Sequence, residues 1–275
     1  MSDAYEVRLW AMCDDPLLPS VEEAYILTMH DSARLQRPAA QALRRLARRT
    51  YVQVNAGYRT GLKEAAVDGP SRDIVHAYKH ACGECLKEGH VLILEDDATF
   101  MPGATAAHFA EVDAFLRTAD FDTYSFGSFG PFLTLGRHRR FMCLVGHAQA
   151  VVYSPLARER IRAVDVRAVK HIDAHVISKM ARNFTYRRPL VVQHIVPTDN
   201  IEEWGCNRHR HTRCERWWVR VWVRMMSGGL RLDRELWGWH VLYALNVATC
   251  LVLWSVPAAC AAALVAGVTA GVLAA

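Results

Sequence analysis

The sequence predicts an α/β domain followed by a membrane-spanning C-terminal tail, and three observations lead to this prediction. Over roughly the first 200 residues, short apolar runs typical of strands alternate with longer segments of helical spacing. One apolar run, Val91–Leu94, ends abruptly in three consecutive carboxylates, Glu95, Asp96 and Asp97. The last forty residues, Leu236–Ala275, contain no Asp, Glu, Lys or Arg. We therefore expect three regions: an α/β domain at 1–204, a basic Trp/Arg-rich juxtamembrane segment at 205–235 and a transmembrane tail at 236–275.

The composition is that of a folded chain. Hydrophobic residues make up 52% and charged residues 22% of the 275 residues, which excludes disorder, collagen and coiled coil. The net charge is +5, and the stretch 205–234 alone contributes eight Arg against two acids. The rest of the chain is therefore close to neutral, which argues against a uniformly basic nucleic-acid-binding protein. Eight scattered cysteines are too few for a disulfide scaffold, so reduced thiols are expected.

Each expected element follows from local periodicity and from the turn residues around it. Short apolar or β-branched runs predict strands at Ala24–Met29, Tyr51–Val54, Val91–Leu94, Thr123–Phe126, Phe141–Leu144, Ala148–Tyr153 and Leu190–Gln193. Longer amphipathic segments predict helices at Ser32–Arg49, Arg72–Glu88, Ala106–Arg117, Pro155–Arg162 and His171–Arg182. The resulting order, strand and helix in alternation, is typical of an open α/β sheet.

The uncharged tail is longer than one membrane crossing requires. As a helix it would span roughly 60 Å, about twice the thickness of the hydrocarbon core. We expect two short crossings with a break near Ser255 and Pro257, and the alternative is one crossing with a loosely held end. The residues that flank the tail on its N-terminal side are basic: Arg220, Arg224, Arg231 and Arg234. Because positive residues tend to remain cytoplasmic, the α/β domain is expected to face the cytosol.

The juxtamembrane segment itself allows more than one interpretation. Arg216, Arg220 and Arg224 recur every four residues among tryptophans and valines, which favours a helix lying on lipid headgroups. The same stretch also alternates like a strand, and an Arg/aromatic surface for nucleic acid is a further alternative.

The acidic triplet at the end of Val91–Leu94 is the strongest chemical signal. Three adjacent carboxylates repel one another unless a cation or hydrogen-bond donors offset their charge. In an extended chain Glu95 and Asp97 point to one side and Asp96 to the other. Hard oxygen ligands favour Mn²⁺ or Mg²⁺, and ligands of open α/β sheets bind at the carboxyl ends of strands. The alternative is a solvated acidic turn that precedes a helix.

The run Val91–Asp97, preceded by a helix carrying His76 and followed by Met101-Pro-Gly103, resembles the pattern of glycosyltransferase family 25. This family comprises lipooligosaccharide-type and procollagen galactosyltransferases. Val75 stands where the family has a serine before the histidine. Four further segments match in the family's order: Tyr25–Met29 with Arg34 and Arg37, Gly146–Tyr153, His171–His175 and Leu190–Gln193. Together the matches cover roughly Tyr25 to Ile201.

The resemblance implies a GT-A-like nucleotide-sugar-binding fold that takes a UDP-sugar, with galactose or glucose as the sugar, through an Mn²⁺-type ion. It assigns Asp97 to the metal, and Glu95, Asp96 and His76 to binding of the donor. It also makes Asp173 the candidate catalytic base of an inverting transfer. For Asp173 the alternative is a first-turn carboxylate that stabilises the helix that follows it.

The sequence thus predicts a membrane-anchored glycosyltransferase acting on a glycan, lipid or protein acceptor. The alternative from another class is a catalytically inactive scaffold of the same fold, and a metal-dependent phosphoesterase would need more ligands than one triplet offers. Two cysteine patterns stand apart from this chemistry. Cys82 and Cys85 are expected to form a buried thiol pair rather than a zinc or redox site. The array Cys206, His209, His211 and Cys214 is predicted to be an exposed loop, with a strained zinc site as the alternative.

Overall fold

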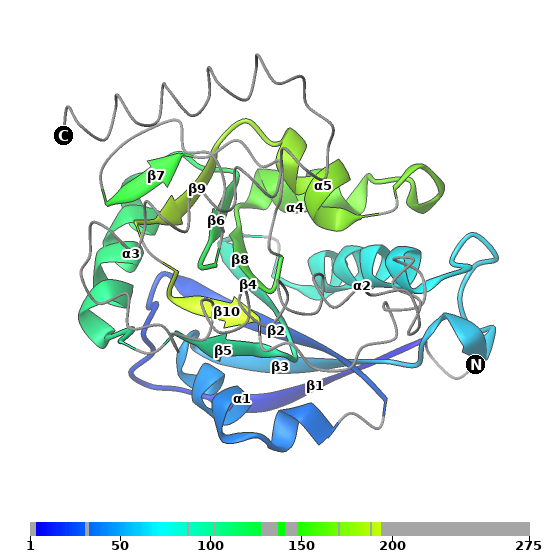
Figure 1. Ribbon diagram of the computed structural model, residues 1–275, viewed down its shortest axis with the longest axis horizontal. Coiled ribbons are helices and arrows are strands. Elements are labelled where there is room, and N and C mark those ends of the chain that lie inside the picture. The colour runs from blue at the N-terminus through cyan, green and yellow to red at the C-terminus, as the bar shows by residue number, and fades with distance from the viewer. Residues whose placement is uncertain are drawn as a thin grey trace, which may run out of the picture.

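A computed structural model describes residues 4–30, 33–86, 88–101, 103–127, 137–140, 148–169, 171–187 and 189–193 (Figure 1). The described part forms one mixed α/β fold around an eight-stranded sheet with the order β1-β3-β2-β4-β8-β6-β9-β7, and a separate two-stranded sheet, β5-β10. The strands are β1 (Tyr5–Met12), β2 (Val21–Met29), β3 (Arg49–Asn55), β4 (His90–Glu95), β5 (Ala98–Phe100), β6 (Thr123–Ser125), β7 (His138–Arg140), β8 (Ala150–Tyr153), β9 (Asn183–Tyr186) and β10 (Val191–Gln193). The α-helices are α1 (Pro38–Ala42), α2 (Pro70–Glu84), α3 (Ala106–Thr118), α4 (Pro155–Arg162) and α5 (Ile172–His175), and short 3-10 turns are η1 (Ala33–Gln36), η2 (Leu43–Arg45), η3 (Tyr58–Thr60), η4 (Val166–Ala168) and η5 (Ile177–Lys179).

Strand direction places several chain ends at one edge of the main sheet. β2, β3 and β4 run parallel, so their carboxyl ends meet at the same edge. β8 runs antiparallel to β4, and its first residues therefore lie at that edge as well. This is the edge at which an open α/β sheet binds ligands.

The two faces of the sheet are covered by different layers (Figure 1). Along β4, Val91 and Ile93 pack toward α2 and α4, whereas Leu92 and Leu94 pack toward α1, α3 and the small sheet. These four side chains, on both faces of the strand, are almost completely buried. This explains why the sequence of β4 is a continuous apolar run instead of an alternating one. The polar side chains that follow this run therefore stand at the edge of the sheet, beyond the core.

The helices begin where local sequence signals place them. Pro70 and Pro155 occupy the first turns of α2 and α4, where proline is favoured because its missing N–H would have no partner. Ser154 caps α4 by accepting a hydrogen bond from the N–H of Ala157. At the start of α3, Thr105 and the side chain of His108 form a reciprocal capping box. α4 has the bounds predicted from the sequence, and α3 extends one residue further than predicted.

Three predicted helices differ in the structure. The helix predicted at Ser32–Arg49 is divided into η1, α1 and η2, because Arg37 precedes a proline and adopts an extended backbone. The helix predicted at Arg72–Glu88 begins at Pro70 and ends at Glu84. The helix predicted at His171–Arg182 ends at His175, and Asn183 begins strand β9.

The predicted strands within the described residues are all present, with ends shifted by a few residues. β1, β5, β7 and β9 were not predicted from the sequence. The strand expected at Phe141–Leu144, the juxtamembrane segment 205–235 with its cysteine and histidine array, and the tail 236–275 lie outside the described residues. Among the described helices, none has the length and apolar character needed to cross a membrane.

Candidate active site

The acidic triplet forms the turn that leads out of the central strand. Glu95 is the last residue of β4, and Asp96 and Asp97 precede β5 directly. The turn is fixed to both neighbouring strands, because the N–H of Glu95 donates to the carbonyl of Gln149 (2.9 Å) and the N–H of Asp96 donates to the carbonyl of Leu27 (3.1 Å). Asp96 and Asp97 are only 7% and 6% exposed. Two nearly buried carboxylates at a strand end differ from the solvated acidic turn that was the alternative.

Asp96 is bound from the α1 face of the sheet. Its Oδ2 accepts a hydrogen bond from the hydroxyl of Thr28 at 2.7 Å, and its Oδ1 accepts one from the guanidinium of Arg34 at 2.8 Å. Thr28 belongs to β2 and Arg34 to η1, so the end of the neighbouring strand and the turn after it both hold this carboxylate. The Arg34–Asp96 ion pair, whose arginine side chain is 24% exposed, offsets one of the three negative charges.

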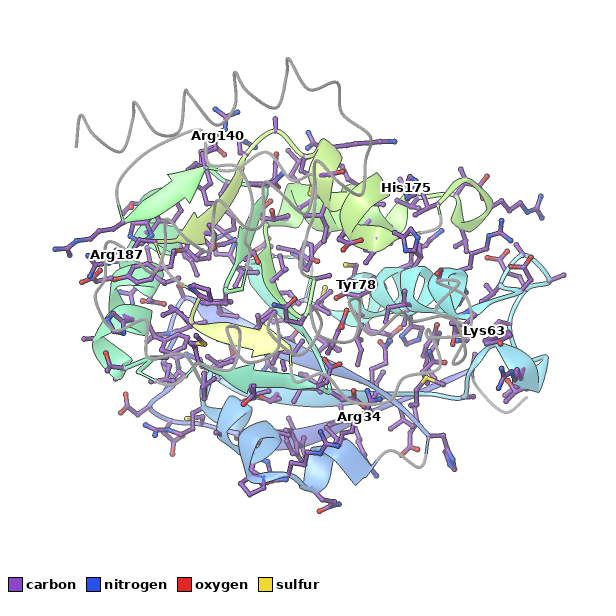
Figure 2. All side chains as sticks on the ribbon, in the orientation of Figure 1. Arg34, Lys63, Tyr78, Arg140, His175 and Arg187 are labelled. Carbon is purple, nitrogen blue, oxygen red and sulfur yellow. The ribbon has the colours of Figure 1, made fainter. Side chains whose placement is uncertain are left out.

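Glu95 turns to the opposite face, as the extended-chain periodicity predicted. Tyr78 of α2 lies against it, with 3.4 Å between the hydroxyl oxygen and Oε1, and the same hydroxyl donates to the carbonyl of Ala148 at 2.8 Å. Burial raises the pKa of the Glu95 carboxyl to about 8, and the charges of Asp97, Asp173 and Asp96 add to this rise in that order. Tyr78 and Arg34 thus approach the end of β4 from α2 and from η1 (Figure 2).

Asp173 joins the same group of charges from a distant part of the chain. Its carboxylate contributes to the raised pKa values of both Glu95 and Tyr78. It stands in the first turn of α5, whose N-cap residue, His171, makes no side-chain cap. The charge of Asp173 therefore acts on the acidic turn, and the first-turn position that the alternative interpretation required is also present.

His76 is placed in a different cluster. Its Nδ1 lies 2.7 Å from the hydroxyl of Tyr5, and the two rings are stacked with centroids 5.5 Å apart. Burial lowers the pKa of His76, and the positive charge of Lys63 lowers it further. Among the contacts that the described residues make with His76, we find none with Glu95, Asp96 or Asp97.

The neighbouring cluster is an ion pair that the sequence did not reveal. The ammonium of Lys63, 1% exposed, donates to Asp73 and to the side-chain oxygen of Asn55. Asn55 ends β3, and its amide also donates to Asp73 at 3.2 Å. Lys63 lies over the ring of Tyr5, 4.6 Å from its centroid. These contacts close the loop between β3 and α2 beside the site, and no local sequence pattern marks the three partners.

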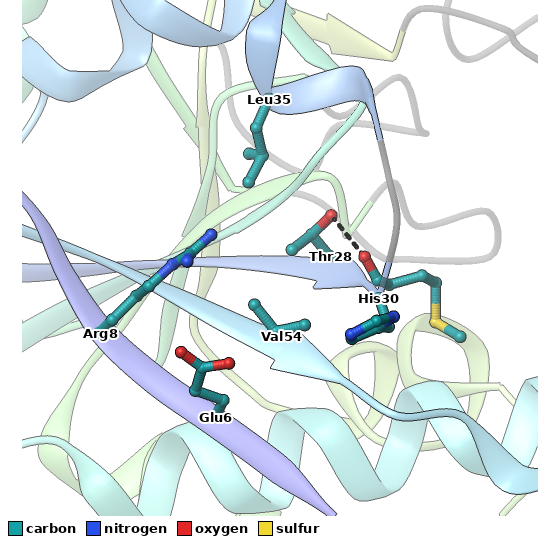
Figure 3. A pocket seen from close by; sticks show the side chains of 7 residues that line it. Glu6, Arg8, Thr28, His30, Leu35 and Val54 are labelled. Atoms are coloured by element: carbon teal, nitrogen blue, oxygen red, sulfur yellow. Dashed lines mark hydrogen bonds between the residues drawn. The ribbon is translucent and has the colours of Figure 1, made fainter. Parts of the chain in front are cut away.

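A polar pocket of about 240 Å³ adjoins Asp96 on the α1 face (Figure 3). It is lined by Glu6, Arg8, Thr28, Met29, His30, Leu35 and Val54. Thr28 belongs both to this pocket and to the hydrogen bonds of Asp96. The pocket therefore opens at the carboxyl ends of β2 and β3, next to the acidic turn.

The residues of the acidic turn suit a divalent cation in their chemistry, and their arrangement limits how many could bind it. Carboxylate oxygens are the ligands that Mn²⁺ and Mg²⁺ prefer, and the raised pKa of Glu95 reflects burial together with uncompensated negative charge. Across the described residues, however, no three His, Cys, Asp or Glu side chains surround one point as a metal site requires. An ion here would depend on one or two protein carboxylates, with waters and ligand oxygens as its other partners.

Cys82 and Cys85 lie apart from this chemistry and are a buried thiol pair, as predicted. Both are free and buried, and the guanidinium of Arg158 donates to Sγ of Cys85 at 2.8 Å. Burial raises the pKa of each thiol, which makes both poor nucleophiles.

Glu95→Gln is expected to stabilise the folded protein in metal-free buffer. Because burial and neighbouring charge raise the pKa of Glu95 to about 8 from an ordinary value of 4.5, the folded state retains a proton that the unfolded state releases. Wild-type stability should therefore fall as the pH rises from about 4.5 to 8, and the variant should lack this loss. We expect an advantage of several kcal/mol at pH 8.5, because each unit of the raised pKa corresponds to about 1.4 kcal/mol, and little advantage at pH 5, measured by denaturant unfolding. Equal pH dependence of both proteins would contradict the raised pKa.

No family model and no curated protein matches the chain. Among solved structures it is similar to a mannose-1-phosphate geranyltransferase from Thermus thermophilus, with 12% sequence identity and a TM-score of 0.33. The match covers 61% of this chain and 73% of that one. A likeness of this size carries no activity from one protein to the other, so function has to be inferred from the residues of the site.

Proposed function

We propose that the protein is a membrane-anchored glycosyltransferase of the family 25 type, which moves a hexose from a UDP-sugar to a hydroxyl of a glycan, lipid or protein acceptor. The observation that carries this function is the convergence of Glu95, Asp96, Asp97 and Asp173 at the carboxyl end of a central parallel strand. Such a concentration of acids, of which Asp96 and Asp97 are nearly buried, is costly for stability, and a cationic or hydroxyl-rich ligand is its simplest use. The uncharged tail would anchor the domain, with its active site on the cytosolic side.

The donor nucleoside fits the pocket beside Asp96. A nucleobase has apolar faces and a polar edge. In the pocket, Leu35 and Val54 could contact the faces of the base, and Arg8 and Glu6 could contact its edge. The guanidinium of Arg8 can donate to a base carbonyl, and the carboxylate of Glu6 can accept from a ring N–H. From this pocket the diphosphate would extend toward Arg34 and the acidic turn.

Asp97 would hold the divalent ion, Mn²⁺ or Mg²⁺. When bound, the ion offsets the negative charge that develops on the departing diphosphate. Thr28 and Arg34 contribute indirectly, because their hydrogen bonds to Asp96 fix the turn on which Asp97 lies. Tyr78 fixes the other side of the turn through Glu95.

Asp173 is the group proposed to activate the acceptor. The acceptor hydroxyl attacks the anomeric carbon, its proton passes to the Asp173 carboxylate, and the bond from the anomeric carbon to the diphosphate oxygen breaks, so that UDP leaves with the electron pair. Attack from the face opposite the leaving group inverts the anomeric configuration. Asp173 suits this role because its charge acts on the acidic turn although it comes from α5, a separate element.

The direct test is hydrolysis of a panel of UDP-sugars by the full-length chain in detergent, with Mn²⁺ and with EDTA. The expected result is turnover of one donor that EDTA abolishes and Mn²⁺ restores. A folded protein that neither turns over nor binds any donor would overturn the glycosyltransferase function and favour the membrane-anchored scaffold. Release of inorganic phosphate rather than of free sugar and UDP would instead point to a phosphoesterase.

A further inference from the structure

Gln149 directly precedes β8 and lies across from the acidic turn. The antiparallel ladder between β4 and β8 pairs Leu94 with Ala150, and the N–H of Glu95 donates to the carbonyl of Gln149 at 2.9 Å. Residues that face each other in an antiparallel pair project to the same side of the sheet. Continuation of this pairing by one residue places Glu95 and Gln149 opposite each other on the same side of the sheet, at its functional edge.

The side-chain amide of Gln149 is buried without a hydrogen-bond acceptor. The residue is 1% exposed, and its Nε2 has no partner among the groups that the structure describes. Gln53 on β3 is equally buried but satisfied, because its Nε2 donates to the carbonyl of Ala77 at 2.9 Å and its Oε1 pairs with His80 at 2.9 Å. Buried donors are almost always bonded in folded proteins, so an exception calls for an explanation.

Gly127 makes the position of this amide possible. A Cβ atom on Gly127 would lie 2.2 Å from Nε2 of Gln149, which is far inside contact distance. The amide thus occupies the space that the absent side chain leaves just beyond the end of β6. The carbonyl oxygen of Val191 would lie 2.3 Å from the same Cβ, yet the amide nitrogen makes no hydrogen bond to it or to any other described group.

The two neighbours have opposite hydrogen-bonding character. The Gln149 amide nitrogen only donates, whereas the carboxyl group of Glu95 presents oxygens that can accept. A sugar hydroxyl donates one hydrogen bond and accepts others, so it can use both a donor and an acceptor. A phosphate would be repelled by the carboxylates beside the amide. We propose that Gln149 is a sugar-binding residue whose amide donates to a hydroxyl of the sugar at the active site, an inference that rests on the glycosyltransferase function proposed above.

The variant that tests this role is Gln149→Leu in the full-length chain, with Gln53→Leu as the matched control. Leucine has a similar size but no donor, so Gln149→Leu should leave the thermal unfolding midpoint unchanged or slightly raised, while Gln53→Leu should lower it by breaking two hydrogen bonds. In UDP-sugar hydrolysis we expect Gln149→Leu to raise KM by about tenfold, the loss of one or two neutral hydrogen bonds. Unfolding midpoints that fall equally in both variants would show a structural role for the amide and would overturn the inference.

Donors that lack one hydroxyl at a time identify the group that is bound. The wild-type protein should discriminate about tenfold against the analogue without the contacted hydroxyl, and Gln149→Leu should treat that analogue and the parent alike. If Gln149→Leu leaves UDP-sugar hydrolysis unchanged but slows transfer to an acceptor about tenfold, the hydroxyl that Gln149 binds belongs to the acceptor sugar instead. If neither hydrolysis nor transfer changes, Gln149 is not a sugar ligand although the glycosyltransferase function stands. A wild-type protein without donor turnover or binding would overturn both.

Discussion

Replacing Asp97 with asparagine is expected to lower metal-dependent turnover of the UDP-sugar by about a hundred- to a thousandfold, because the only change is the charge that would hold the ion. Asparagine keeps the size and one oxygen of the carboxylate, so the buried turn should still fold. Turnover should be measured over a range of Mn²⁺ concentrations. If Asp97 binds the ion, replacing it should raise the Mn²⁺ concentration needed for half-maximal turnover. It should also lower the maximal rate of turnover.

The control for this experiment is another buried carboxylate away from the site. Asp113 of α3 is 3% exposed and accepts a hydrogen bond from the N–H of Ser20 at 2.7 Å. Asp113→Asn should reduce stability without changing the dependence on Mn²⁺. If Asp97→Asn keeps more than about a tenth of the wild-type activity, Asp97 is not the metal ligand.

The largest loss of stability is expected from Lys63→Met. The ammonium is 1% exposed and its partner Asp73 is 6% exposed, so removing the lysine leaves a carboxylate buried without its counter-charge. Breaking a buried pair from one side typically costs about 3–5 kcal/mol. Chemical denaturation monitored by tryptophan fluorescence or circular dichroism would measure this loss, and the difference should appear in the midpoint with the slope unchanged.

Two further variants separate the charge effect from a general loss of packing. Lys79 donates to the carbonyl of Val164, and Lys79→Met should cost less than about 1 kcal/mol. The double variant Lys63→Met with Asp73→Leu should recover part of the loss, because it removes the stranded charge. A double variant as unstable as the sum of both single variants would show that the two side chains act independently.

The parts of the fold that the sequence predicted are those governed by short-range patterns. β4 was recognisable because both its faces are buried and its run of apolar residues ends in charges. β1 was not predicted although Glu6 and Arg8 alternate with apolar residues, because this alternation is short and breaks at Leu9, which is 51% exposed and stands where the edge strand has a bulge. β9 was missed because the residues before it continue a helical spacing, although the helix itself ends at His175.

In the candidate site, too, the features set by short-range patterns were predicted and those created by folding were not. The triplet Glu95–Asp97 was predictable from one strand, and the divergence of Glu95 from Asp96 followed from strand geometry. The position of Asp173 came from a family resemblance, and no spacing in the sequence connects it with Glu95. Tyr78 and Gln149 were not predicted, since each reaches the site from another element through contacts that only the folded chain creates.

The small sheet has a consequence for how the protein is made. β5, which follows Asp97 immediately, pairs with β10, and the N–H of Met101 donates to the carbonyl of Leu190 at 2.9 Å. These partners are synthesised about ninety residues after the acidic turn. The strand that follows the turn, β5, can therefore pair with β10 only when Gln193 has been made. Until then the crowded carboxylates lack the restraint that β10 supplies. The site should therefore mature as one of the last steps of folding, and any shortened version of the protein has to retain β10 to be active.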